Sequence, residues 1–274
     1  MSVDSGTSPL PARCDRGWLP ADGGQTGEYL RPSPHALPPV VVGPVATRPE
    51  GVTVLHTMWS VKGGSGVSVT SSLAATMLAR GRGRALVVDL QGDQPAVLGI
   101  DEPSGPGVRD WLASTDGSES ALDRLLIEVG RGLWLLPSGS ATTWPAGRPE
   151  QLVAALRRMR CEVVVDAGML QGPGLVEQPV VTVGRTLAGS GRSWLVMRPC
   201  YLSIRRAVAA RVSADGLIVV VDPGRSIPAR DVSRSLRTPV IATINVDPAI
   251  ARSVDSGQLI RRSRGLDKSL RGVA

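Results

Sequence analysis

The sequence predicts an α/β fold in three layers, with a mostly parallel central sheet and helices on both faces. Three observations predict it. Apolar runs alternate along the chain with segments of helical spacing. The runs hold almost no polar positions, as is typical of strands buried on both faces. A glycine-rich turn joins the first apolar run to the first helical segment, the order that begins a βαβ unit.

Composition allows a sizeable buried core. The chain has 274 residues, of which 42 % are hydrophobic and none is phenylalanine, so Val, Leu, Ile and Ala must build the core. No apolar run approaches the ~18 residues needed to span a bilayer, and the N-terminus lacks the pattern of a secretory signal. Cys14, Cys161 and Cys200 are far apart, which predicts neither a disulfide framework nor a zinc site. We therefore expect a protein of the reducing cytoplasm.

The charge is strongly basic. The formal net charge is +7, and only Lys62 and Lys268 among the 31 basic residues are lysines. Such a balance favours polyanionic partners, either DNA bound without sequence preference or an acidic membrane surface. Localisation at the nucleoid or at a membrane therefore stays open beside a purely cytoplasmic one. Solubility alone is the alternative explanation of the charge.

Composition and hydrophobic pattern divide the chain into two regions. Residues 1–50 are rich in Pro, Gly and Ser and predict a disordered tail, whereas residues 51–274 predict one folded domain. Strands are expected at 52–60, 84–90, 161–168, 193–199, 216–222 and 239–244. Helices are expected at 67–81, 149–159, 203–213, 229–237 and from about Pro248. Segment 122–139 predicts a short helix or strand, a turn and a strand, while 100–120 and 169–192 predict loops or short helices.

The glycine-rich turn predicts a phosphate-binding loop. It lies in "WSVKGGSGVSVTSS", residues 59–72. Backbone N–H groups of such a turn converge on an anion, and the helix that follows adds its positive N-terminus. The expected binding residues are Lys62, Gly63, Gly64, Ser65, Gly66, Val67 and Ser68. The Ser68 hydroxyl lies where it would hold Mg²⁺, and the slim Lys62 ammonium suits a tight phosphate cradle better than a guanidinium does.

Three carboxylates extend this predicted site. Asp89 ends the apolar run "ALVVD" and Asp166 ends "EVVVD", so both are expected at the carboxyl edge of the sheet, close to the glycine turn. There Asp89 and Asp166 would act with Ser68 on a metal, or with Asp93 on an attacking water. The alternative is that these aspartates only cap the segments that follow them.

The motifs together resemble the MinD/ParA family of P-loop ATPases with a deviant Walker A loop. "KGGSGVS" resembles the loop, "VVDLQGD" the second motif and "VVVDAG" the Walker B strand, and the likeness covers about residues 51–260. It implies a P-loop NTPase fold, ATP and Mg²⁺ as ligands, and a homodimer in which Lys62 reaches the partner's nucleotide. It also implies that Asp222-Pro223 and residues 245–248 contact the base, although turn formation explains these residues equally well.

Two positions depart from that family's pattern. Val67 stands where the family has a phosphate-binding lysine, and Gln91 stands where it has a second carboxylate. Asp93, two residues further on, is the candidate to replace that carboxylate. We therefore expect nucleotide binding with slow or absent hydrolysis, in a dimeric positioning, partitioning or scaffolding protein. One alternative is a slow ATPase that drives chromosome or plasmid partition or septum or pilus placement. Another is a structural pseudoenzyme that binds an unknown protein partner.

The C-terminal segment allows two interpretations. Leu259, Ile260, Leu266 and Leu270 lie among basic side chains, a composition shared by amphipathic membrane helices. Gly265 and Gly272 interrupt the pattern, which favours a basic tail folded on the domain.

Overall fold

The computed structural model describes residues 53–170, 178–210, 212–224, 227–263, 270, 272 and 273; the predicted tail at 1–50 lies outside them. Within these residues, eight strands form one sheet in the order β3-β4-β2-β5-β1-β6-β7-β8. Seven of these strands are parallel, and β3 is antiparallel to β4. The strands are β1 Leu55–Ser60, β2 Ala85–Asp89, β3 Ile127–Gly130, β4 Leu133–Leu136, β5 Glu162–Met169, β6 Arg192–Met197, β7 Gly216–Val221 and β8 Val240–Asn245.

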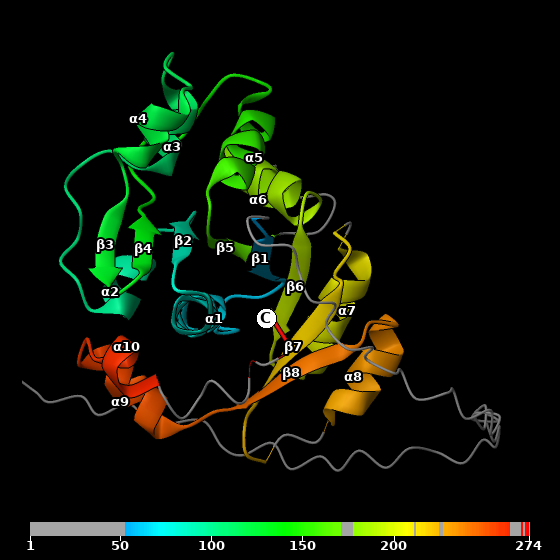
Figure 1. Cartoon of the computed structure of the whole chain (residues 1–274). Coiled ribbons are helices and arrows are strands. Elements are labelled where there is room, and N and C mark those ends of the chain that lie inside the picture. Colours follow the sequence, from blue (N-terminus) through cyan, green and yellow to red (C-terminus); the bar gives the residue numbers. More distant parts are fainter. Residues whose placement is uncertain are drawn as a thin grey trace, which may run out of the picture. The chain divides into compact units, whose positions relative to one another are not determined.

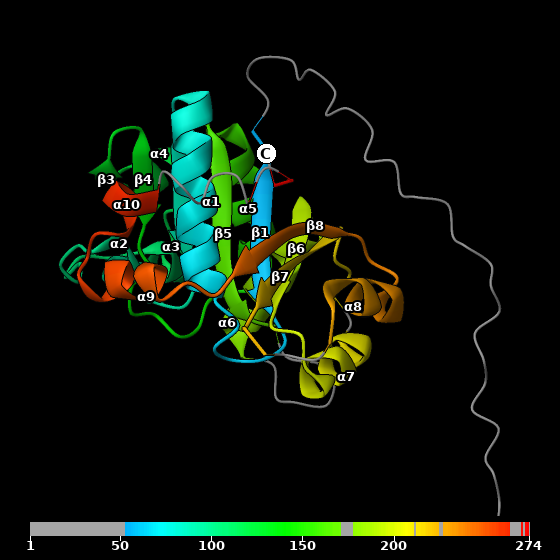
Figure 2. The ribbon, with the colours of Figure 1, turned by 90° about the horizontal axis from the view of Figure 1, so that it is seen from below.

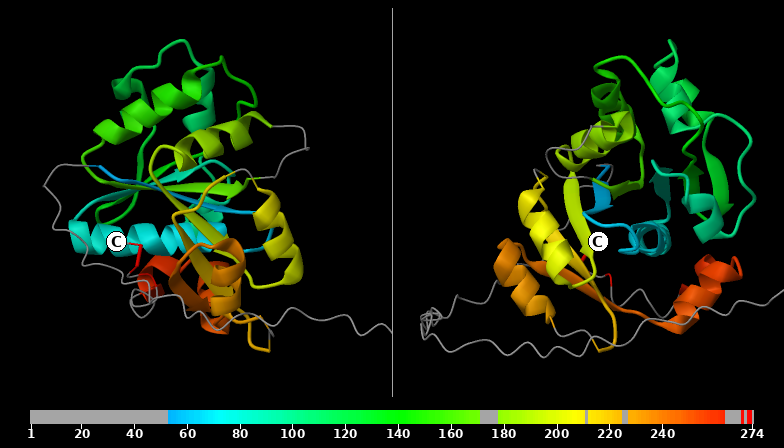
Figure 3. Two further views of the ribbon diagram at one scale, coloured as in Figure 1. Left: turned by 90° about the vertical axis from the view of Figure 1, so that its right-hand side faces the viewer. Right: turned by 180° about the vertical axis from the view of Figure 1, so that it is seen from behind.

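Helices cover both faces of this sheet, as Figures 1 and 3 show. They are α1 Val67–Arg82, α2 Gln94–Leu98, α3 Val108–Ala113, α4 Glu119–Asp123, α5 Arg148–Arg158, α6 Pro179–Ala188, α7 Tyr201–Ala209, α8 Ala229–Leu236, α9 Pro248–Asp255 and α10 Leu259–Arg262. One face packs against α1, α2 and α10, with α9 beside them (Figure 2). The other packs against α3, α4, α5, α6 and α8. The three-layer α/β fold is confirmed.

Alternation along the strands builds the two cores. In β2, Leu86 and Val88 belong to one buried cluster, whereas Ala85 and Val87 belong to the other. Successive side chains of a strand point to opposite faces, so a strand covered on both sides must be apolar at every position. This requirement explains why the central strands read as unbroken apolar runs.

The element boundaries show where the sequence patterns were incomplete. The central strands and α1 lie within a few residues of their expected positions. Helix α7 is Tyr201–Ala209 rather than 203–213, because Ala210 is extended. The short α2 and α10 were not predicted individually, and the segment expected as loops or short helices around 169–192 contains α6.

The described residues of the C-terminal segment pack on the domain. Leu259 and Leu270 are each 1 % exposed and belong to the α1 side of the core, while Leu266 lies outside the described residues. A Cβ at Gly272 would stand 2.2 Å from the Ile241 carbonyl oxygen of β8, so the backbone approaches that strand closely. Among the described residues, no helix has the length and apolarity to cross a membrane.

Candidate functional site

The glycine loop joins β1 to α1 and leaves the N-terminus of that helix uncapped. Gly64 and Gly66 have φ of 71° and 91°, a left-handed conformation that favours glycine. The Ser65 hydroxyl donates to the Lys62 carbonyl at 2.7 Å and fixes the turn. The first turn of α1 has no side-chain cap and no acidic residue. Since the first N–H groups of a helix have no intrahelical acceptor, these donors can meet an anion.

Val67 faces the protein core and contributes no charge to the loop. It is 6 % exposed and belongs to the cluster that includes Met58 and Leu73. Lys62 extends along the outside of the loop instead, where its Nζ lies 3.4 Å from the Gly63 carbonyl oxygen. The loop thus has one ammonium, on its exposed side.

Ser68 and Asp93 lie together beside the first turn of α1. The Ser68 hydroxyl donates to the Asp93 carboxylate at 3.4 Å. Asp93 occupies the position before α2 and is exposed. Its carboxylate is therefore accessible next to the hydroxyl that the sequence predicts as a magnesium ligand.

Asp89 and Asp166 lie side by side at the ends of β2 and β5, where they are register partners. Both are 0 % exposed. Asp89 accepts hydrogen bonds from the backbone N–H groups of Gln91, Gly92 and Gln94 at 2.9, 2.7 and 3.0 Å. The two carboxylates therefore meet at the expected edge of the sheet, but beneath its surface rather than in an open crevice.

Burial dominates the titration of this pair. It raises the pKa of Asp166 to about 6, and the neighbouring Asp89 carboxylate acts in the same direction. Burial also raises the pKa of Asp89, although its three backbone hydrogen bonds oppose the rise. Two buried like charges disfavour joint ionisation, so a cation placed here would lower both pKa values.

Gln94 connects the whole constellation and was not predicted from the sequence. Its Nε2 donates to Asp166 at 2.7 Å and to the Ser68 carbonyl at 3.0 Å, while its Oε1 accepts from the Ser72 hydroxyl at 2.6 Å. Gln94 is fully buried. The sequence signal was only its place between Asp93 and Pro95 at a helix start; its partners come from distant segments.

The Gln91 side chain is hydrogen-bonded to the backbone near the end of β5. Its Nε2 donates to the Ala167 carbonyl at 3.0 Å. A Cβ at Gly168, whose φ is 62°, would stand 2.4 Å from Gln91 Cγ. Gln91 therefore fills the space beside Gly168.

An apolar pocket of about 300 Å³ adjoins the glycine loop. Gly66 and Thr70 line it on the loop side, and residues 245–247 line it on the other. Its remaining walls are Val69, Leu73, Arg198, Val220, Ile244, Ile250, Ala251, Val254 and Asp255. Arg198 also pairs with Asp222 at 3.6 Å. The segments that the family resemblance associates with a base thus lie on or beside this pocket.

No group of three acidic, histidine or cysteine side chains with metal-site geometry occurs in the described part of the chain. The oxygens of Ser68, Asp89 and Asp166 nevertheless have the chemistry that Mg²⁺ prefers. Their roles, and those of Lys62, Val67 and Asp93, stay predictions.

Comparison with known proteins identifies the fold. No protein-family model matches the sequence, and neither does any curated protein sequence. Solved structures do match. A ParA family ATPase from Chlorobium tepidum has a TM-score of 0.61 at 19 % identity, over 80 % of this chain and 96 % of that one. The septum site-determining protein MinD from Pyrococcus horikoshii, complexed with Mg-ADP, has a TM-score of 0.58 at 19 % identity, over 80 % of this chain and 92 % of that one. McdA from Cyanothece has a TM-score of 0.58 at 14 % identity, over 81 % of this chain and 98 % of that one. The chain therefore has the fold of the MinD and ParA-family proteins.

Proposed function

We propose that this chain binds a purine nucleotide, ATP or ADP with Mg²⁺, at the glycine loop and the pocket beside it. One observation carries the proposal. Gly66 is both the residue before the uncapped α1 and part of the wall of the apolar pocket. A ligand with an anionic end and a flat apolar end would thus meet both kinds of surface at one place.

The phosphate end of the ligand is supported by the geometry of the loop. Helix α1 has 16 residues, and neither a side chain nor an acidic group competes at its N-terminus. Phosphate at such a terminus receives backbone hydrogen bonds and a favourable dipole. Lys62 adds an ammonium on the exposed side, where it would act on a phosphate of its own ligand or of a partner's.

The base end of the ligand is supported by the composition of the pocket. Aliphatic side chains of α1, β7, β8 and α9 form its walls, and Asn245 and Arg198 stand among them. A few polar groups among apolar walls are typical of small-molecule sites, where they fix the orientation of a ligand. The amide of Asn245 has both a donor and an acceptor, which suits the edge of a purine.

Magnesium would be held by the Ser68 hydroxyl, and the Asp89 and Asp166 carboxylates would balance its charge from the ends of β2 and β5. The bound cation would neutralise phosphate charge and lower the pKa values of the two aspartates. Asp93 would hold a water or the Ser68 hydroxyl. In the absence of a cation, the Gln94 amide donates a hydrogen bond to the Asp166 carboxylate and orients it.

Hydrolysis is proposed to be slow or absent. Val67 puts no charge near the transferred phosphate, and Gln91 is hydrogen-bonded to β5. Charge stabilisation of a phosphoryl group is the main contribution of such sites, so its loss costs rate more than binding. We infer a dimeric positioning or scaffolding protein that uses nucleotide mainly as a ligand. The likeness in fold to MinD with Mg-ADP and to an ATP complex of Cyanothece McdA supports a nucleotide as the ligand.

The test is a calorimetric titration with Mg-ATP and Mg-ADP, together with an assay of phosphate release. Ala251 is exposed, lines the pocket and belongs to α9, so Ala251→Trp fills the pocket without opening the core. Its matched control is Ala249→Trp, at an exposed position of the same helix outside the pocket. We expect Ala251→Trp to weaken binding by about tenfold or more, whereas Ala249→Trp leaves it unchanged.

Three outcomes decide between the alternatives. Binding with no phosphate release supports the proposal, and release that Asp89→Ala abolishes supports a slow ATPase. No binding of either nucleotide at about 10 mM overturns the proposal in favour of a pseudoenzyme.

A further inference from the structure

A second cavity, of about 470 Å³, lies at the opposite edge of the sheet from the glycine loop. Arg84 precedes β2, Cys161 precedes β5, and Trp134 is the second residue of β4. Asp89 is at the other end of β2, so at ~3.3 Å per residue the cavity lies roughly 17 Å from it. Whatever binds here is separate from the proposed nucleotide.

The cavity combines an apolar floor with charged walls. Leu126, Trp134, Ala155 and Met159 supply apolar surface, and its volume falls within the ~300–1,000 Å³ of small-molecule sites. The charged lining residues are Arg84, Glu119, Asp123, Arg158 and Arg160.

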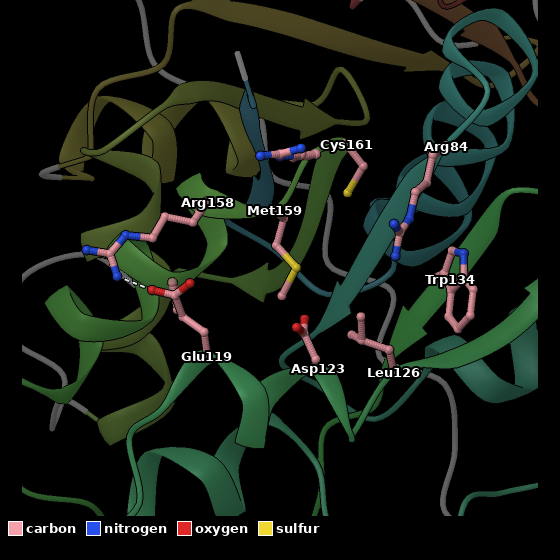
Figure 4. A pocket seen from close by; sticks show the side chains of 10 residues that line it. Arg84, Glu119, Asp123, Leu126, Trp134, Arg158, Met159 and Cys161 are labelled. Carbon is pink, nitrogen blue, oxygen red and sulfur yellow. Dashed lines mark hydrogen bonds and ion pairs between the residues drawn. The ribbon is translucent and has the colours of Figure 1, made fainter. Parts of the chain in front are cut away.

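Three of these charged residues, Arg84, Asp123 and Arg160, form no ion pair in the described part of the chain. Arg158 forms an ion pair with Glu119, drawn as a dashed line in Figure 4. Within the described ranges, neither Arg84 nor Asp123 takes part in an ion pair. Figure 4 shows their charged ends directed toward the cavity from different elements, with Leu126 and Met159 lying nearby.

The Arg84 guanidinium lies over an aromatic ring, and a partly buried thiol lies beside the exposed Arg84 and Asp123. The Arg84 guanidinium carbon lies 5.4 Å from the centroid of the Trp134 ring. Stacking on one face leaves the N–H groups of a guanidinium free to donate in its plane. Burial raises the pKa of the Cys161 thiol to about 11, so the thiol is neutral at pH 7; Arg84 and Asp123 influence it in opposite directions. Both charges therefore act on the same small volume.

We propose that this cavity binds a small zwitterion with an apolar body, of the α-amino acid class. The carboxylate of the ligand accepts hydrogen bonds from Arg84, and its ammonium donates to Asp123. The apolar body packs on Leu126, Met159 and Trp134. A ligand with both charges can match Arg84 and Asp123 together, whereas a ligand with one charge can match only one of them, so the zwitterion gains the additional contact.

The first experiment removes one charge of the ligand at a time. L-Phenylalanine, 3-phenylpropionate and 2-phenylethylamine share one apolar body and differ only in their charged groups. We expect calorimetry to give a Kd of about 1 mM or lower for phenylalanine, and at least about tenfold weaker binding for each analogue. No binding of phenylalanine at about 10 mM, or equal binding of an analogue, overturns the proposal.

The second experiment removes one charge of the protein at a time. Arg84→Gln should weaken phenylalanine and abolish 3-phenylpropionate binding, while Asp123→Asn should weaken phenylalanine and abolish 2-phenylethylamine binding. Matched controls are Arg131→Gln and Asp101→Asn, at exposed positions outside the cavity. Arg84→Lys keeps the charge and should retain part of the affinity. Equal losses in the control variants overturn the assignment, and circular dichroism checks that each variant is folded.

Discussion

At the scale of single residues, Gln94 is the side chain with the most consequence for the site. Its amide satisfies a fully buried aspartate, and its carbonyl oxygen accepts from Ser72. We expect Gln94→Leu to lower the free energy of unfolding by about 1–3 kcal/mol, because Asp166 loses a donor that water cannot replace. Urea unfolding measures this change. Gln178→Leu, at an exposed position, is the control and should change stability little.

Asp166 itself predicts a pH dependence of stability. Its pKa is about 6 in the folded protein, above the ordinary 3.8. The folded state therefore binds more protons than the unfolded state between these values, and its unfolding free energy falls as pH rises through them. The loss is complete above pH 6 and amounts to roughly 3 kcal/mol.

Urea unfolding of the wild type and of Asp166→Asn, from pH 4 to pH 8, checks this prediction. Between pH 4 and pH 8, the unfolding free energy of Asp166→Asn should fall much less than that of the wild type. A wild-type stability that rises steadily over the same range would contradict it.

Val67 predicts the effect of restoring a lysine. Val67 is buried on the α1 side of the core, so the lysine of Val67→Lys would keep its aliphatic stem there and would have to extend its ammonium out of that cluster toward bound phosphate. We expect Mg-ATP to bind about tenfold or more tightly, because a charge-assisted contact is gained. Calorimetry measures the affinity, and Val67→Arg is the control whose bulkier guanidinium should gain less. Unchanged affinity in Val67→Lys would show that a lysine at this buried position does not reach the ligand.

At the scale of elements, two glycines give opposite predictions. Gly81 lies inside α1, and a Cβ added there would have no atom within 4 Å, whereas Gly272 lies against Ile241. Gly81→Ala should raise the free energy of unfolding by about 0.5–1 kcal/mol, through lower backbone entropy in the unfolded chain. Gly272→Ala should lower it by about 1–3 kcal/mol, because β8 blocks the added carbon. Thermal unfolding of both variants checks the difference in sign.

The elements also show what the sequence could predict. Buried parallel strands must be apolar throughout, so β2, β5 and β7 could be recognised from composition alone. Helix α2 could not, because five residues beginning with Gln94-Pro95 carry too little periodicity. The glycine loop was visible as a local pattern. The Gln94 bridge was not, because Ser72 and Asp166 approach it only through the folded topology.

At the scale of the whole molecule, the proposed dimer has a candidate surface. Tyr201, Leu202 and Val208 on α7 are 76 %, 41 % and 68 % exposed. Arg206 of the same helix approaches the Val61 carbonyl at 3.5 Å, directly before Lys62. An interface that brings Lys62 to a partner's nucleotide would therefore also cover α7.

Sedimentation velocity with Mg-ATP tests this interface. Val208→Glu should weaken self-association by about tenfold or more, because it places a charge in a desolvated contact. Ala154→Glu, exposed on α5, is the matched control. A wild type that stays monomeric with nucleotide would contradict the dimer.

The burial of Leu270 and Val273 against the α1 side of the core has a practical consequence. These two side chains belong to the same buried cluster as residues of α1, the helix that follows the phosphate loop. An affinity tag fused directly after them, or a truncation before them, would loosen the packing of that helix. Purification handles for nucleotide-binding measurements therefore belong at the N-terminus.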